Sequence, residues 1–300
     1  MAIALKGDFI GFSFNEHRSE SLGIVRVSDG SRYNEDLVPT AQDKTVQVPG
    51  GDGFYYFGSD YTQKPFTIPI AFDGLTEKQF RELQQVFGTK ELGKLVFDER
   101  PYKYYMVKSG KPQLKYICFG KEGERIYKGE GTLTFTAYYP FAKSIFKFLN
   151  EYGNKNKDEW KEASGMKAEK GIYDIVSNNG SISVYNAGDL ETDFILKFSL
   201  PVDSTPIGDI KITLSKENVG KIEAFLDLNG FSKKGADTGF QINTKTNLIE
   251  GFNAEGLTGT LYNENITQGD FFKIPPREEG YQISVTGATP IEIVYDYIYY

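Results

Sequence analysis

The sequence is poor in the residues that build metal centres and disulfides. Its 300 residues include one cysteine, Cys118, and one histidine, His17. A single cysteine excludes an internal disulfide framework and a zinc site made of several thiolates. A single histidine leaves neither a multi-histidine metal centre nor a catalytic pair of histidines. We therefore expect no metal and no other cofactor.

Long apolar runs and an excess of basic charge are missing too. No stretch approaches the roughly 20 apolar residues of a membrane-spanning helix, and the opening residues 1–7 are too short for the apolar region of a signal peptide. The 34 basic and 41 acidic residues give a net charge of −7, which excludes a dedicated nucleic-acid binder. We expect a protein made in the cytoplasm and not exported by a secretory signal, with no membrane and no nucleic acid among its partners.

Charge and length predict two domains. Residues 1–150 hold 20 basic and 18 acidic residues, a net +2, whereas residues 151–300 hold 14 and 23, a net −9. A chain of this length can bury two cores. The polar, charge-dense residues 153–170 are typical of a linker. We therefore predict a first domain at 1–152 and a second at 171–300.

Strand patterns dominate both halves. Aromatic residues make up 15% of the chain and favour half-buried β surfaces, while 32 glycines favour turns. Apolar and polar residues alternate, as strands require, at 66–72, 132–138, 194–198 and 210–214. Pro69 cannot donate a ladder hydrogen bond, so its strand is predicted to lie at a sheet edge or a bulge.

Turn and helix signals complete this pattern. Asn179–Gly180 and Asn229–Gly230 predict tight hairpins and hence antiparallel sheets. Residues 76–88 carry a capping box, an apolar face at helical spacing and a closing glycine, which together predict a helix that packs on a sheet. A second helix is predicted from Pro140, because apolar residues follow it at helical spacing as far as Tyr152.

None of the candidate catalytic or binding motifs is specific. The neighbouring acids Asp98–Glu99 point to opposite faces of a strand, so they do not form the facing pair of a glycosidase. The glycine-rich residues 50–53 lack the lysine and helix of a phosphate-binding loop. His17 has no nucleophile elbow to accompany it, and the spacing of residues 186–193 does not match a twelve-residue calcium loop. The residues alone indicate a soluble, mostly β protein that is not an enzyme.

Five motifs follow one another in the first half: Phe12–Asn15, Val48–Gly53, the strand Pro65–Phe72 before the first helix, Leu95–Tyr105 and Gly131–Ala142. In this order they resemble the N-terminal domain of siphophage distal tail proteins, the hub family of the tail tip. Each motif alone is weak, but the series is specific.

Three motifs of the second half resemble the galectin-like C-terminal domain of the same family: Tyr185–Asp189, Gln241–Thr244 and Gly269–Pro276. Asn243 stands where the family has an acid, and Pro276–Gly280 replaces the usual Pro-Gly-x-Asn. The resemblance implies a mainly β fold with two β-sandwich-like domains, the first with a packed α-helix and an extended hairpin, the second galectin-like.

The resemblance also implies a structural role in the virion, at the distal end of the phage tail. Six copies would form a ring whose N-terminal domains stack on the tail tube protein and on the tail-associated lysin or hub protein. The galectin-like domains would carry receptor-binding or other baseplate proteins. The charge split fits this arrangement, because near-neutral domains can approach one another closely while acidic outer domains stay soluble.

Strand-rich subunits can join across sheet edges, which suggests where the ring contacts lie. We expect them at the edge marked by Pro69 and on a hairpin over residues 100–120. The candidate interface residues are Pro69, Asp98, Arg100, Tyr102, Tyr104 and Tyr105.

A carbohydrate-binding adhesion module that recognises host cell-wall saccharides is the alternative function, because galectin-like folds can hold sugars. Such sites stack a tryptophan on the sugar and surround it with His, Arg and Asn. No Trp or His follows Trp160, and Arg277 is the only arginine there. We therefore expect the fold without the sugar site. A cell-wall hydrolase ranks third, because neither paired acids nor a zinc site supports it.

Overall fold

The computed structural model divides the chain into two compact units. Unit 1 comprises residues 1–145 with Tyr300, and unit 2 comprises residues 146–299. The predicted linker at 153–170 lies almost wholly outside the described residues, so the predicted domain boundaries stay a prediction. The structure describes residues 11–27, 38–50, 52–121, 124–145, 148–151, 154–155, 175–176, 181–184, 186, 188–200, 208–216, 221–230, 234–256, 258–276, 281–288 and 290–300.

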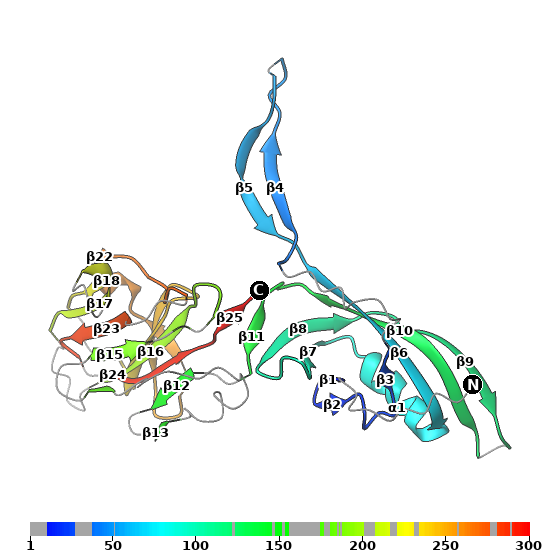
Figure 1. Cartoon of the computed structure of the whole chain (residues 1–300). Coiled ribbons are helices and arrows are strands. Elements are labelled where there is room, and N and C mark those ends of the chain that lie inside the picture. The colour runs from blue at the N-terminus through cyan, green and yellow to red at the C-terminus, as the bar shows by residue number, and fades with distance from the viewer. Residues whose placement is uncertain are drawn as a thin grey trace. The chain divides into compact units, whose positions relative to one another are not determined.

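In its described residues, unit 1 is a bent antiparallel sheet with one helix and two projecting pairs of strands (Figure 1). Its main strand order is β2-β1-β7-β8-β10-β6-β3, with β9 added to β10 and β11 to β8, while β4 and β5 form a separate two-stranded sheet. No helix of the described residues is long and apolar enough to cross a membrane. The elements are β1 (Phe12–Phe14), β2 (His17–Arg18), β3 (Val25–Arg26), β4 (Ala41–Val46), β5 (Tyr55–Tyr61), β6 (Lys64–Thr76), α1 (Glu77–Phe87), β7 (Leu92–Phe97), β8 (Lys103–Ser109), β9 (Gln113–Phe119), β10 (Ile126–Ala137) and β11 (Ala142–Ser144).

The predicted alternation builds the core of unit 1. On β6 the residues Phe66, Ile68, Ile70 and Phe72 are buried and their neighbours face outward. β10 pairs with β6 over its whole length and buries its own alternate residues in the same way. Because alternate side chains of a strand point to one face, one apolar face per strand suffices to build this core.

Helix α1 closes that core, as the sequence predicts. Thr76 caps it, and Gln79 completes the capping box. Phe87 stacks on Phe14 of β1, with ring centroids 5.9 Å apart, and lies 6.1 Å from the ring of Phe135 on β10. Gly88 ends the helix without a positive φ; a side chain there would collide with the carbonyl oxygen of Gln84, which the backbone N–H of Gly88 binds.

Two predictions about unit 1 are wrong. The segment after Pro140 forms strand β11 instead of a helix, because residues 143 and 144 pair with β8 and alternate side chains, Ala142 and Ser144, are buried. Residues 100–120 do not form a hairpin either: β8 pairs with β7, and β9 pairs with β10. Extended hairpins do occur in unit 1, but they are β4–β5 and β9–β10.

Unit 2 consists of two antiparallel sheets (Figure 1). Their orders are β13-β12-β24-β16-β19-β20-β21 and β14-β15-β23-β17-β18-β22. The elements are β12 (Phe148–Glu151), β13 (Asn154–Lys155), β14 (Ile175–Val176), β15 (Ser181–Val184), β16 (Phe194–Ser199), β17 (Ile210–Lys216), β18 (Ile222–Leu228), β19 (Gly239–Asn243), β20 (Leu248–Phe252), β21 (Thr258–Leu261), the 3-10 helix η1 (Asn263–Asn265), β22 (Ile266–Gly269), β23 (Tyr281–Thr286), β24 (Pro290–Tyr295) and β25 (Ile298–Tyr299).

The core of unit 2 follows from the same alternation. β16 buries Phe194, Leu196 and Phe198, and β17 in the other sheet buries alternate residues from Ile210 to Leu214. The rings of Phe198 and Phe240 stack with centroids 4.6 Å apart. The mainly β, sandwich-type fold predicted from the sequence is confirmed.

The two predicted hairpin turns have different outcomes. β14 and β15 pair on either side of Asn179–Gly180, as a hairpin requires, although the turn itself lies outside the described residues. The hairpin at Asn229–Gly230 is wrong, because β18 before it pairs with β17 and β22 and not with the next strand along the chain. Gly230 does have a positive φ of 65°, so the turn forms without joining neighbouring strands.

The turn between β1 and β2 carries backbone strain. Its two central residues, Asn15 and Glu16, have φ angles of 48° and 70°, which side chains other than glycine rarely adopt. Asn15 compensates, because its Oδ1 accepts a 3.0 Å hydrogen bond from the backbone N–H of Lys94 while its own N–H donates to the Lys94 carbonyl. Glu16 has no comparable bond among those that the structure describes.

We predict that Glu16→Gly stabilises unit 1 by about 0.5–1 kcal/mol, because glycine adopts this φ without steric cost. Asn15→Gly is the matched control and should destabilise the protein, since it removes the bond to Lys94. Chemical denaturation of both variants measures the difference. Equal effects of the two substitutions would contradict the assignment of strain to Glu16.

Candidate assembly surface

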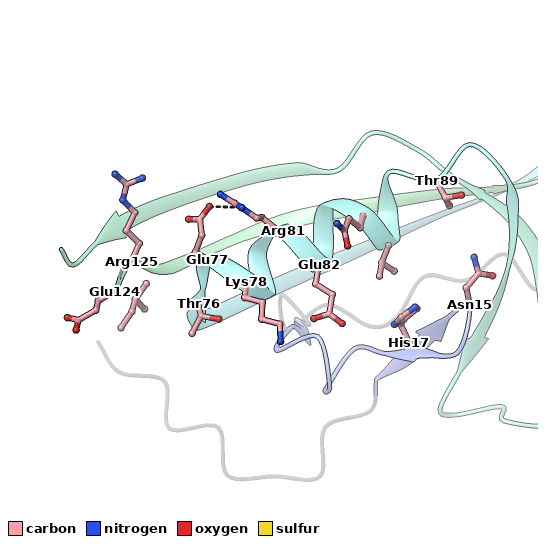
Figure 2. Close-up of a pocket in the computed structure, with 13 residues that line it drawn as sticks. Asn15, His17, Thr76, Glu77, Lys78, Arg81, Glu82, Thr89, Glu124 and Arg125 are labelled. Atoms are coloured by element: carbon pink, nitrogen blue, oxygen red, sulfur yellow. Dashed lines mark hydrogen bonds and ion pairs between the residues drawn. The ribbon is translucent and has the colours of Figure 1, made fainter. Parts of the chain in front are cut away.

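Unit 1 has a hollow of about 1250 Å³ beside helix α1 (Figure 2). Its walls come from the polar face of α1, the β1–β2 turn with His17, and residues 124–126 at the start of β10. The charged groups in it include Glu77, whose Oε1 lies 3.1 Å from Nε of Arg81. Among the described residues no group of three or more His, Cys, Asp or Glu side chains is placed to hold a metal. The described lining residues of the hollow form one ion pair, Glu77–Arg81.

An aromatic cluster ties α1 to β9 and β10. The ring of Phe80 stacks on Tyr127 at 4.4 Å and lies 5.0 Å from Tyr116 of β9. The Tyr127 hydroxyl donates a hydrogen bond to Oε2 of Glu77, in the first turn of the helix. This bond raises the pKa of Tyr127 to about 12 and lowers the pKa of Glu77. Tyr127 pairs with Cys118 close to the turn that joins the two strands, so the helix fixes the pair near that turn.

That strand pair is the first of two projecting surfaces. We call residues 111–132, which hold β9 and the paired part of β10, the β9–β10 arm. Tyr116 faces the helix, so Ile117 and Phe119 point to the opposite face, where their cross-strand partners are Lys128 and Ile126. Ile117 is 64% exposed and Phe119 48%. Among the described residues β9 pairs with β10 alone, which leaves its other edge without a strand partner.

The second projecting surface is the hairpin of β4 and β5, residues 41–61, which we call the β4–β5 arm. Tyr55, Tyr56 and Phe57 are each about two-thirds exposed. Tyr55 and Tyr56 are neighbours on one strand, so aromatic side chains cover both faces of the hairpin. Tyr61 anchors the base of the arm through an edge-to-face contact with Phe141, 5.2 Å between centroids. Figure 1 shows the arm extending away from the rest of unit 1.

The end of the β4–β5 arm contains the glycine-rich residues 50–53. Gly50 and Gly53 have φ angles of 83° and 91°, and nothing lies within 4 Å of the position that a side chain would take at either. Glycine is therefore needed there for its conformation and not for close approach of another group. Gly50 and Gly53 lie in the connection between β4 and β5, and a strand follows them instead of the helix of a phosphate-binding loop.

The predicted residue Pro69 lies close to a sheet edge. β3 covers only Ile70 and Ala71 of β6, and the Val27 N–H donates to the Pro69 carbonyl. The nitrogen and carbonyl of one strand residue point to the same side, so the missing donor of Pro69 faces this sparsely covered side. Its role in a ring contact remains a prediction.

Four of the other predicted interface residues remain candidates. Asp98 lies in the turn after β7, and its Oδ2 accepts a 2.9 Å hydrogen bond from the Gly11 N–H. Arg100 and Tyr102 are half-buried in the same loop. Tyr104 is half-buried on β8, with Nζ of Lys94 5.2 Å from its ring centroid.

The prediction that Tyr105 is an interface residue is wrong. It is 1% exposed and packs on Phe66 with ring centroids 4.8 Å apart. Because neighbouring residues of a strand face opposite ways, Tyr104 and Tyr105 cannot both be available to a partner. Tyr105 is a core residue and is withdrawn from the candidate interface.

Sequence reasoning missed the exposed aromatics of the two arms. The run Phe54–Phe57 has no polar alternation, which is also typical of a strand buried on both faces. The exposure of this run could have been inferred from its position in the sequence, because it lies between the glycine-rich residues 50–53 and the polar residues Ser59 and Asp60.

The motifs of unit 2 have structural roles. Asn186 binds the carbonyls of Leu190 and Ile274 through its amide nitrogen and the Gly188 N–H through its oxygen. Asn243 accepts from the backbone N–H groups of the turn that follows it, and Thr244 accepts from the Phe194 N–H. The side-chain oxygen of Asn186 is thus already bonded within the chain, which argues against a calcium-binding role for it.

We predict that Tyr105→Ala destabilises unit 1 by about 3–5 kcal/mol, as removal of a buried aromatic does. Tyr104→Ala on the same strand should cost less than about 1 kcal/mol. Denaturant titration of both variants distinguishes them. Equal stability loss would contradict the placement of the two rings on opposite faces.

We predict that Tyr127→Phe lowers stability in a pH-dependent way. The lowered pKa of Glu77 stabilises the fold at neutral pH, and this contribution is lost as pH falls through that pKa. The raised pKa of Tyr127 gives a contribution that is present below pH 10 and lost as pH rises to about 12. Thermal melts from acid to alkaline pH should therefore converge for wild type and variant at both extremes. Tyr116→Phe is the control, and a gap of constant size would contradict the Glu77–Tyr127 bond.

One comparison with known proteins finds a match within the first unit. Residues 23–137 match the family model of the phage tail protein RIFT-related domain. None of the curated proteins compared with the sequence matches it.

Two solved structures are similar over nearly the whole chain. The first is the Dit (gp 19.1) protein of phage SPP1, described as a paradigm of the hub adsorption apparatus in phages that infect Gram-positive bacteria; its TM-score is 0.60 and its identity 12%, over 98% of this chain and 100% of that one. The second is the baseplate of phage P2 in its activated conformation with Ca, with a TM-score of 0.46 and 11% identity, over 97% and 98%. Residues 23–137 thus resemble the phage tail protein RIFT-related domain and the chain has a fold similar to that of Dit, which confirms the predicted resemblance to the siphophage distal tail family.

Proposed function

We propose that the chain is a structural protein of the distal end of a phage tail, where six copies form a ring. One observation carries this proposal: unit 1, which contains the tail-protein domain, presents aromatic strand surfaces that a solitary chain leaves in water. Uncovered apolar patches and strand edges of this kind are typical of surfaces that bind another protein.

In this role the ring joins the tail tube protein to the tail-associated lysin or hub protein, and unit 2 carries receptor-binding or other baseplate proteins. The charge distribution supports the division, because residues 1–150 have a net charge of +2 and residues 151–300 a net charge of −9. Subunits that meet through their near-neutral halves pay little electrostatic repulsion. The proposed role involves no catalytic step.

We predict a solution mass of about 202 kDa, six times the 33.7 kDa chain. Size-exclusion chromatography with light scattering, over a concentration series and at two salt concentrations, measures it, and negative-stain images should show rings. A chain that stays monomeric at every concentration would contradict self-assembly and would justify a glycan screen of unit 2.

A further inference from the structure

We propose that the β4–β5 arm of one copy docks on the outer face of the β9–β10 arm of the next copy. The inference rests on the proposed ring and specifies the contact that builds it. Both arms belong to unit 1, and each is described by its own strand pairing.

The β4–β5 arm needs a covering surface. A two-stranded hairpin is marginally stable in water when neither face is packed. All described residues of β4 and β5 are exposed except Gly58, which is half-exposed. Most polar contacts of this hairpin are short-range or cross-strand, such as the Lys44–Asp60 ion pair at 2.5 Å. The apolar side chains that remain uncovered are Val46, Val48, Phe54, Tyr55, Tyr56 and Phe57.

The β9–β10 arm offers a surface of the matching kind. Ile117, Phe119 and Ile126 share its outer face and are between 36% and 64% exposed. The free edge of β9 can accept backbone hydrogen bonds from an added strand, as in β-strand addition. The opposite face is already packed on α1 through Tyr116 and Tyr127, so a docking strand meets a surface fixed by the helix.

Charge selects this pairing over contact between two identical arms. The β4–β5 arm has one basic and three acidic residues, a net −2, and the β9–β10 arm has five basic and three acidic residues, a net +2. Contact between two β4–β5 arms would bring like charges together, whereas contact between the two kinds of arm brings opposite charges together.

Two different surfaces on each copy are also what a ring requires. A head-to-tail contact uses one surface of each type per copy and closes when the rotation between copies divides a full turn. A contact between identical surfaces would stop at a dimer. The presence of both arms on one unit therefore permits rings without a second protein.

Two substitutions test the contact separately. Phe57→Asp alters the β4–β5 arm, and Ile117→Asp alters the β9–β10 arm; both side chains are about two-thirds exposed. Each variant should fold and remain monomeric in light scattering. Leu261→Asp in unit 2, at a side chain 54% exposed, is the matched control and should keep the ring. Circular dichroism melts confirm that all three chains fold.

Mixing the two variants gives the sharper result. Each contributes the arm that the other lacks, so an equal mixture should form one intact contact per pair and yield dimers of about 67 kDa, twice 33.7 kDa. A mixture that stays monomeric, or a ring formed by either variant alone, overturns the proposed contact. A monomeric wild-type chain overturns the proposed self-assembled ring itself, and a ring of another size contradicts the number six but not the contact.

Discussion

A two-stranded β-hairpin cannot bury its own faces, so it needs another element to pack on it. This constraint governs unit 1. The body of the unit satisfies it, because α1 buries Phe80, Leu83 and Phe87 against the sheet. The β4–β5 arm does not, since its aromatics remain in water. The core of the unit is therefore fully packed, while the apolar surface of the β4–β5 arm stays exposed to water. This exposed surface is the physical basis for placing the unit in an assembly.

Packing contacts hold each arm to the body of unit 1. The Tyr127–Glu77 hydrogen bond and the stacked ring of Phe80 hold the β9–β10 arm to α1, and Tyr61 with Phe141 holds the β4–β5 arm. A docking surface held in this way loses less conformational entropy on binding than a free loop does. Each arm therefore combines a fixed attachment with an uncovered face.

The sequence predicts what local periodicity determines. Alternation locates β6, β10, β16 and β17 with their buried faces, and the capping box locates α1. Prediction from periodicity fails where pairing with a distant strand determines the secondary structure. Residues 140–152 have helical spacing, yet pairing with β8 makes β11 a strand. For Tyr104 and Tyr105 both faces of the strand are apolar in sequence, so only the packing of Tyr105 on Phe66 shows which ring is buried. The same ambiguity concealed the exposure of Phe54–Phe57.

Exposed aromatics would also promote unspecific association, so the arms need a feature that selects one partner. Opposite net charges on the two arms supply it, because they favour head-to-tail contact and disfavour contact between like arms. Buried apolar area then provides the affinity and charge provides the choice of surface. The acidic second half, with a net −9, adds long-range repulsion between assemblies while leaving the near-neutral first half free to associate. This distribution of charge along the chain favours an ordered assembly of the apolar arms over unspecific association.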